Sequence, residues 1–262
     1  MQKIGISHQV IKSIRKLKKK SSDSLLVIEG LGVMEMAIQN KIEVKAFLYC
    51  GELIHSEEAF KVKEQYEAVA DHTYEITKKT YDYICDKDNS AGFIAVVKQN
   101  LLKIEEVDFK ALNFVLILNG LELPGNLGSI YRTAYATNVD LIINADCVTD
   151  ICHPKFVTSS RGVFFGLPTV NTTYEIIQTK LLDNNFRILL AEPELGQSFH
   201  GFNYDDKIAI VVGSERFGIN KNWYQNQHEK VYIPMRDNIK SLNVGVAASI
   251  LIYEAAIQKG KI

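Results

Sequence analysis

The stretch NGLELPGNLGSIYRTAYATNVD, from Asn119 to Asp140, decides the fold of this 262-residue chain. It follows the apolar run FVLIL, which is typical of a buried strand. The Pro-Gly pair within the stretch breaks the strand, and Asn126 is a good N-cap, so a helix is predicted over Leu127–Thr137. The chain therefore turns from a strand into a helix at this point.

The same turn is a candidate binding site. Ser129 and Arg132 lie three residues apart on the predicted helix, so their side chains point together. A strand end that leads into a polar helix start is a place to bind an anion or a ribose. A capped turn that carries a surface arginine has the same pattern, and this stretch alone does not separate the two interpretations.

From Asn113 onward, near-continuous Val/Ile/Leu runs alternate with helical patterns. Such runs predict a parallel sheet covered by helices on both faces. The predicted strands are FVLIL, VDLIINA, FFGLPTV, FRILLAE, KIAIVVG and KVYIPM, and the predicted helices are Leu127–Thr137, His153–Ser160, Thr173–Asn184, Asn220–Gln227 and Val244–Lys259. No GxGxxG follows any of these strands, which disfavours a dinucleotide-binding Rossmann domain.

The first hundred residues carry a separate and smaller α/β pattern. Strands are predicted at LLVIEG, Val44–Tyr49 and GFIAVVKQ, with helices at LGVMEMAIQN, Glu57–Val69 and ITKKTYDYIC. The polar, acidic stretch LLKIEEVDFKAL, residues 101–112, looks like a linker. We therefore expect an α/β protein with one domain over residues 1–100 and a second over residues 113–262.

The segment SHQVIKSIRKLKKK, which starts at Ser7, predicts an amphipathic helix with a basic face. Its cations are Lys12, Arg15, Lys16 and Lys19, to which Lys18 and Lys20 add. No acid offsets this cluster before Asp23, although the whole chain has a formal net charge of −1. The cluster is either a face that binds RNA phosphates or an ordinary solvated face.

The composition indicates which classes of protein the chain can belong to. A content of 47% hydrophobic and 23% charged residues is ordinary for a soluble globular enzyme. The sequence has neither a bilayer-spanning apolar run nor an apolar signal core, so we expect a cytoplasmic protein without membrane contact. Cys147, Cys152 and His153 are close in sequence but lack a fourth zinc ligand, so free thiols and no metal site are expected.

Three motifs occur in order at predicted strand ends: NxGxxxR from Asn126, GSExxG from Gly213, and IPM…SLNV from Ile233. Together they resemble the SpoU (TrmH-like) family of RNA ribose methyltransferases, of the knotted SPOUT class. The resemblance covers Phe114–Lys259 strongly and the first hundred residues loosely. It implies a parallel-sheet methyltransferase domain with a trefoil knot, preceded by a small ribosomal-protein-like domain that binds RNA.

The resemblance implies S-adenosylmethionine-dependent methylation of a ribose 2′-hydroxyl in structured RNA, by a homodimer that meets through its knotted domains. Large-subunit rRNA is the expected substrate, because the accessory domain resembles that of the family's rRNA enzymes, and tRNA is the alternative. A catalytically silent RNA-binding protein on this fold is a different interpretation. It is disfavoured because the implied catalytic residues are intact, namely Asn126, Arg132, Glu215 and Asn243. A nucleotide-binding regulator is disfavoured because no Lys-Ser/Thr pair follows PGNLG.

The resemblance also implies roles for single residues. Arg132 is placed at the target ribose and phosphate, where we expect orientation and charge stabilisation because arginine is a reluctant base. The implied catalytic residues are Arg132, Asn126, Glu215, Ser241 and Asn243. The implied cofactor contacts are Leu190, Ala191, Gly213, Ile233, Met235 and Leu242, with Gly213 letting the backbone approach the cofactor. The Asn243 side chain is also a good helix cap, and both roles can hold at once.

Some positions differ from, or extend, the family pattern. Arg161 is similar to an arginine of the thiostrepton-resistance rRNA methyltransferases, which implies a second phosphate contact, and an exposed helix-end arginine is the alternative. Leu123 stands where the family often has aspartate, and Arg236 follows IPM where a glycine is usual. These departures affect the expected geometry of the substrate loops.

Overall fold

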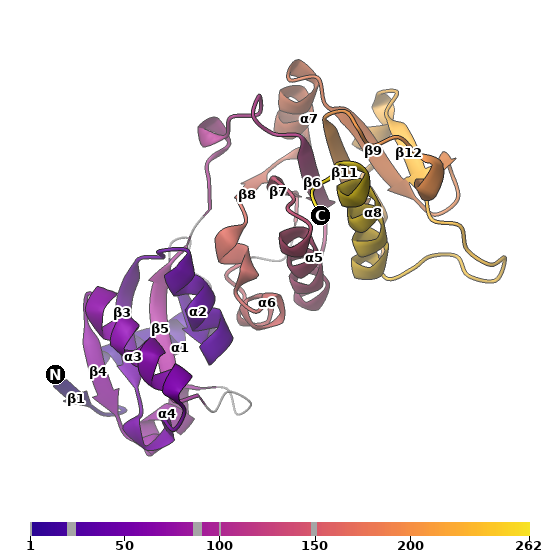
Figure 1. Ribbon diagram of the computed structural model, residues 1–262. Coiled ribbons are helices and arrows are strands. Elements are labelled where there is room, and N and C mark those ends of the chain that lie inside the picture. The colour runs from indigo at the N-terminus through magenta and orange to yellow at the C-terminus, as the bar shows by residue number, and fades with distance from the viewer. Residues whose placement is uncertain (1, 20–24, 86–90, 100, 148–150) are drawn as a thin grey trace. The chain divides into compact units, whose positions relative to one another are not determined.

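The computed structural model describes residues 2–19, 25–85, 91–99, 101–147 and 151–262 (Figure 1). The chain divides into two compact units, the first made of residues 1–100 and 150–166 and the second of residues 101–149 and 167–262. Each unit has its own sheet. None of the described helices is both long and apolar enough to cross a membrane.

The second unit is built on a seven-stranded sheet in which every pairing is parallel, with strand order β10-β12-β9-β11-β6-β7-β8. The strands are β6 (Phe114–Asn119), β7 (Leu141–Ala145), β8 (Thr169–Thr172), β9 (Arg187–Glu192), β10 (Gln197–Ser198), β11 (Ile208–Gly213) and β12 (Glu229–Tyr232). The apolar runs of the sequence form the central strands because a sheet covered on both faces buries every residue. The predicted parallel sheet is confirmed, and the trefoil knot stays a prediction.

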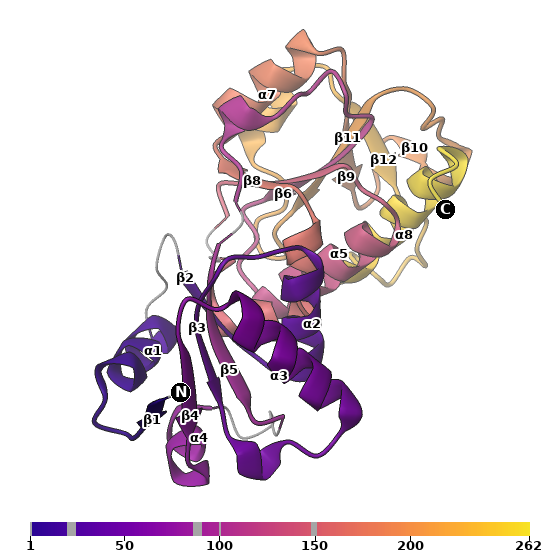
Figure 2. The same ribbon diagram turned by 60° about the vertical axis from the view of Figure 1, so that its left-hand side comes forward.

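Helices cover both faces of this sheet. Helices α5 (Pro124–Ala136) and α8 (Val244–Gln258) pack against each other on one face, and α7 (Tyr174–Asp183) lies on the other, as Figures 1 and 2 show. Trp223 lies on the α7 side, within the short 3-10 helix η5 (Lys221–Gln225). It is fully buried, and its ring stands edge-on to the ring of Tyr174 at 4.8 Å.

Helix α5 begins three residues earlier than the sequence predicts. Its first residue is Pro124 and its N-cap is Leu123, whose side chain makes no capping hydrogen bond. Proline suits the first helical position because its missing N–H would have no partner there. The predicted capping role of Asn126 is therefore wrong, and this residue lies inside the first turn with its side chain available to other loops.

Other predicted elements, in both units, also differ from expectation. The residues FFG form a 3-10 helix, η3 (Val163–Gly166), and only the residues after Pro168 enter the sheet as β8. Within the predicted helix over residues 220–227, only Lys221–Gln225 are helical, and they form the 3-10 helix η5. The segment 101–112 packs on the second unit, where the Leu102 N–H donates to the Thr169 carbonyl at 2.9 Å.

The first unit holds a mixed five-stranded sheet with strand order β1-β4-β3-β5-β2. Its strands are β1 (Gln2–Ile4), β2 (Leu25–Glu29), β3 (Val44–Tyr49), β4 (Thr73–Ile76) and β5 (Phe93–Lys98). Its helices are α1 (Gln9–Lys19), α2 (Leu31–Gln39), α3 (Glu57–Val69), α4 (Lys78–Ile84) and α6 (Pro154–Ser160). Buried residues of α1 and α4 share one apolar core with β3 and β5.

Candidate active site at the strand ends of the parallel sheet

A cavity of about 430 Å³ lies at the carboxyl ends of β9, β11 and β12. Ligand sites of open α/β sheets lie at this edge, and the volume suits a small molecule. Its walls come from the end of β9, the GSERFG turn, the segment after β12 and the first turns of α8. All of these elements belong to the second unit.

Five of the six predicted cofactor contacts line this cavity: Ala191, Gly213, Ile233, Met235 and Leu242. The exception is Leu190, whose side chain is buried in the core between the sheet and α7. Successive side chains of a strand point to opposite faces, so Leu190 and its neighbour Ala191 cannot face the same space. The Leu190 side chain therefore does not contribute to the cavity.

Several lining residues were not predicted from the sequence. These are Glu192, Pro193, Val212, Ser214, Phe217, Gly218, Ile219, Tyr224, Val231, Val244, Ala247 and Leu251. The Tyr224 hydroxyl donates to the Glu192 carboxylate, which joins η5 to the end of β9. Burial, with a smaller contribution from Glu192, raises the pKa of Tyr224 above its ordinary value. The phenol therefore stays protonated at neutral pH and holds this wall of the cavity as a hydrogen-bond donor.

Gly213 is required by the chain's own turn. A Cβ at this position would lie 2.2 Å from the carbonyl carbon of Gly218 and 2.3 Å from the Ile219 nitrogen. The turn is closed by hydrogen bonds from the Ser214 N–H to the Gly218 carbonyl, at 3.1 Å, and from the Gly218 N–H back to the Ser214 carbonyl, at 2.9 Å. The packing of this turn is one reason for the glycine, and the close cofactor approach that the family resemblance implies for Gly213 stays a prediction.

Three of the predicted catalytic residues form one hydrogen-bonded network. The Asn126 side-chain amide donates to the Glu215 carboxylate, and the Asn243 amide donates to the Asn126 oxygen at 3.2 Å. The Asn243 oxygen also accepts from the backbone N–H groups of Gly245, at 2.9 Å, and Val246, at 3.3 Å. Asn243 therefore caps α8 and contacts Asn126 at once. The network joins the starts of α5 and α8 to the GSERFG turn.

The other two predicted catalytic residues lie outside this network. Ser241 is exposed and lines the cavity. Arg132 projects from α5 as an exposed side chain, and the described part of the chain offers it no ion pair or hydrogen bond. Its planar guanidinium is thus available to an anionic group that approaches from solvent.

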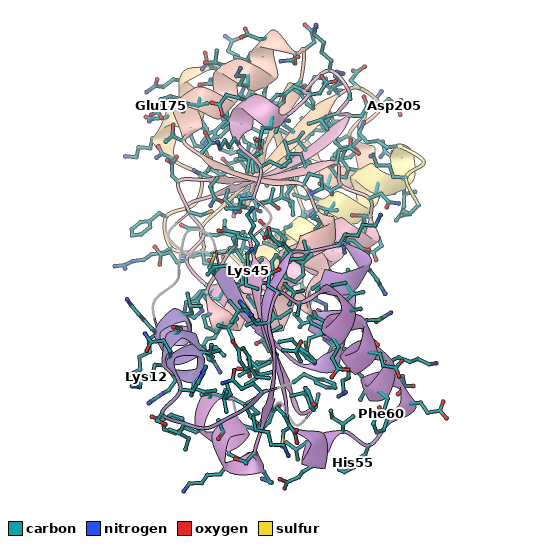
Figure 3. All side chains as sticks on the ribbon, turned by 90° about the vertical axis from the view of Figure 1, so that its left-hand side faces the viewer. Lys12, Lys45, His55, Phe60, Glu175 and Asp205 are labelled. Atoms are coloured by element: carbon teal, nitrogen blue, oxygen red, sulfur yellow. The ribbon has the colours of Figure 1, made fainter. Side chains whose placement is uncertain are left out.

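The four predicted RNA-binding cations of the basic helix, Lys12, Arg15, Lys16 and Lys19, line a second cavity in the first unit. We call this cavity the basic groove. Lys79, Thr80 and Tyr83 of α4 form its other wall, and the Arg15 guanidinium lies 4.3 Å from the centre of the Tyr83 ring. Figure 3 shows Lys12 on α1.

Lys18 and Arg161 lie outside the basic groove. The Lys18 ammonium is 2.5 Å from the Glu29 carboxylate and is mostly buried, so it does not belong to the basic groove. Lys20 lies outside the described residues. Arg161 ends α6 with a left-handed φ of 52° and is exposed; it groups with the first unit.

The cysteines make no metal site among the residues that the structure describes. The Cys147 thiol donates to the Leu118 carbonyl at 3.0 Å, and burial raises the pKa of Cys147 to about 11. Cys152 is buried and groups with the first unit, whereas Cys147 belongs to the second. Burial therefore favours the protonated form of the Cys147 thiol.

Comparison with known proteins agrees with this geometry. Residues 113–253 match the model of the SpoU rRNA Methylase family, and residues 8–95 match the MRM3-like substrate binding domain. The chain is 23% identical over 254 residues to the 23S rRNA (guanosine(2553)-2'-O)-methyltransferase RlmP of Bacillus subtilis, which covers 94% of this chain and 95% of that protein.

Solved structures resemble the chain along its whole length. A crystal structure of an RNA 2'-O ribose methyltransferase matches with a TM-score of 0.81 and 28% identity, over 99% of both chains. The AdoMet-bound rRNA methyltransferase from Sinorhizobium meliloti has the same fold, with a TM-score of 0.84 and 20% identity over 97% of both chains. The family match spans more than half of the chain and includes Asn126, Glu215 and Asn243. The protein is therefore a member of the SpoU rRNA methylase family.

Proposed function

We propose that this SpoU-family enzyme, which transfers a methyl group from S-adenosylmethionine to a ribose 2′-hydroxyl of RNA, acts on large-subunit ribosomal RNA. The observation that carries the proposal is the cavity at the strand ends with the Asn126–Glu215–Asn243 network beside it. The choice of ribosomal RNA rests on the similarity to the 23S rRNA enzyme, which extends over both units. A ribosomal RNA substrate would place the enzyme in the cytoplasm.

The test is mass-spectrometric mapping of ribose methylation in ribosomal and transfer RNA from cells with and without the protein. We expect one 2′-O-methyl group of the large-subunit rRNA to disappear when the protein is absent. A methyl group lost from tRNA alone would overturn the choice of substrate. Unchanged methylation of every RNA would overturn the proposed activity of this chain in the cell.

The lining of the cavity fits S-adenosylmethionine. Apolar side chains such as Ile233 and Leu242 suit the faces of an adenine ring, and backbone groups at the strand ends can bond its edge. Residues such as Ile233 and Leu242 would hold this cofactor, which would supply an electrophilic methyl group bound to a sulfonium sulfur. The chain must hold that donor and bring the hydroxyl into line with it.

We assign the positioning of the RNA to the polar residues beside the cavity. The planar guanidinium fork of Arg132 orients a phosphate next to the target ribose and stabilises negative charge there. Asn126 is held by Glu215 on one side and by Asn243 on the other, which sets the angle of its amide. The Ser241 hydroxyl lies on the cavity wall and completes the group.

We also propose that the basic groove of the first unit holds RNA phosphates. Five cations line it, and none of its lining residues is acidic. Neutralising Lys12, Arg15, Lys16 and Lys19 to glutamine should weaken RNA binding and flatten the plot of log affinity against log salt. The slope should fall by roughly 0.7 to 0.9 for each lost phosphate contact. Filter binding over a salt series measures both quantities.

A matched control removes the same charge elsewhere on the first unit. The control replaces Lys41, Lys45, Lys61 and Lys63, which are absent from the groove, with glutamine. It should leave the salt slope close to that of the wild type. An equal change of slope in both variants would mean that the groove is an ordinary solvated face.

A homodimer is proposed from the surface of α8. Val246, Tyr253 and Ile257 are 50%, 45% and 59% exposed, and with the partly exposed Ile250 they form one stripe along the helix. Such a continuous apolar stripe is a typical protein interface. Light scattering at micromolar concentration should give twice the chain mass of 29.5 kDa. Val246→Lys combined with Ile257→Lys should give monomers, and a wild-type monomer would contradict the proposal.

A further inference from the structure

Phe217 is unusually exposed for its type. At 70%, its exposed fraction is the highest among the large apolar side chains of the described residues. It stands in the GSERFG turn, two residues after Glu215, and it is one of the residues that line the cavity. An exposed phenyl ring beside a binding cavity is a candidate contact for a ligand that arrives from solvent.

The turn holds this residue in a defined place. The Phe217 N–H donates to the Ser214 hydroxyl at 3.1 Å, inside the loop that the Ser214–Gly218 backbone bonds close. Gly213 anchors the loop against its own strand, because no other residue fits there. The backbone that carries the ring is therefore preorganised, and little conformational entropy is lost when the ring meets a partner.

The chemistry of the neighbours points to a nucleobase. The Arg216 guanidinium carbon lies 4.9 Å from the centre of the Phe217 ring, so a cation and an aromatic face are presented together. This pairing is what proteins use for single-stranded RNA, in which bases stack on aromatic rings while cations meet the phosphates. The Glu215–Asn126 contact, which we place at the reacting ribose, lies in the same turn.

We propose that Phe217 is a stacking platform for an unpaired base of the substrate RNA at the mouth of the cavity, with Arg216 beside it for the adjoining phosphate. The site takes the base of the methylated nucleotide or of its direct neighbour, because the turn that carries Phe217 also carries Glu215. The inference rests on the proposed function only in requiring that the enzyme binds RNA. It does not depend on which RNA class is methylated.

Three substitutions at position 217 separate stacking from simple apolar contact. Phe217→Ala should weaken the binding of the substrate RNA by roughly 5- to 150-fold, which is the effect of losing one base–aromatic stack. Phe217→Leu keeps apolar volume but has no flat face, so it should lose nearly as much. Phe217→Trp should bind at least as well as the wild type. S-adenosylmethionine affinity, measured by calorimetry on the same variants, should change much less than RNA affinity, because 70% of the Phe217 side chain faces solvent.

The Phe217→Trp variant also gives a direct spectroscopic readout. Trp223, the only natural tryptophan, is fully buried and supplies a constant background. Stacking of a base on the introduced indole should quench its fluorescence on titration with deproteinised ribosomal RNA or with total tRNA, whichever is the substrate. Quenching with tRNA alone would support stacking while removing the rRNA proposal, so the two failures can be told apart.

A matched control is Phe60→Ala, because Phe60 is 52% exposed on α3 in the first unit, away from the basic groove. Figure 3 shows Phe60 and Lys12 on opposite sides of that unit. This control should leave RNA affinity unchanged. Loss of S-adenosylmethionine affinity in Phe217→Ala would make the ring a cofactor lid, and loss of the dimer would make it an interface residue. Either result, or full binding by Phe217→Leu, overturns the stacking proposal.

Discussion

Replacing Arg132 with lysine should lower the single-turnover rate of methyl transfer by roughly a hundredfold or more, because a misplaced reacting group lowers a reaction rate by about that factor. Lysine keeps the positive charge but lacks the planar fork, so the substitution separates geometry from charge. The side chain is exposed on α5 and makes no hydrogen bond or ion pair within the described chain, so the fold should not change. Arg132→Ala should be at least as damaging.

The measurement is transfer of labelled methyl to ribosomal RNA in a single turnover, with S-adenosylmethionine affinity determined on the same samples. Lys180→Arg is a suitable control, because it replaces an ammonium with a guanidinium on α7, which lies across the sheet from α5. It should react at the wild-type rate. Near-normal rates in both Arg132 variants would reduce this arginine to a surface residue and move the catalytic role elsewhere.

Leu242→Glu should abolish S-adenosylmethionine binding while the protein stays folded. Leu242 lines the cavity and is only partly exposed, so a carboxylate there would have to lose water against an apolar wall that includes Ile233. An uncompensated charge in such a place is costly, and it also excludes an apolar ligand surface. Calorimetric titration with the cofactor measures the effect, and circular dichroism checks the fold.

The control for this substitution is Leu182→Glu, in which the same change falls on an exposed residue of α7. It should bind the cofactor as the wild type does. A folded Leu242→Glu variant with normal affinity would show that the adenosine group does not occupy this cavity.

Much of the second unit could be predicted because each of its central strands is a continuous apolar run in the sequence. The run FVLIL was predicted as a strand and forms β6, which extends one residue further to Asn119. Strands β1 and β4 were missed because they are only three and four residues long, and because their partners, β4 for β1 and also β3 for β4, lie far away in the sequence. The start of α5 was misplaced because the preference of Asn126 for capping was weighed above the fit of Pro124 to the first turn.

For the candidate site, the sequence predicted mainly residues that lie within the three motifs. The motif residues Asn126, Glu215 and Asn243 meet in the structure, but the bonds among them join positions far apart in the chain, which no local pattern reveals. Tyr224 and Leu251 reach the cavity from a 3-10 helix and from the inner side of α8, where nothing in the sequence separates a lining residue from core. Strand alternation alone could have shown that the Leu190 side chain points to the opposite face from that of Ala191.

The strand order of the large sheet has a consequence for synthesis on the ribosome. Strand β6 lies between β7 and β11, and it emerges well before β11 does. At a translation rate of about 5 to 20 residues per second, the roughly ninety residues between them delay the second pairing by about 5 to 20 seconds. For that time one edge of the apolar segment Phe114–Asn119 has no neighbour. Nascent chains of this enzyme therefore expose an unpaired, apolar strand edge to which chaperones can bind. In the folded protein this strand is buried at the centre of the sheet.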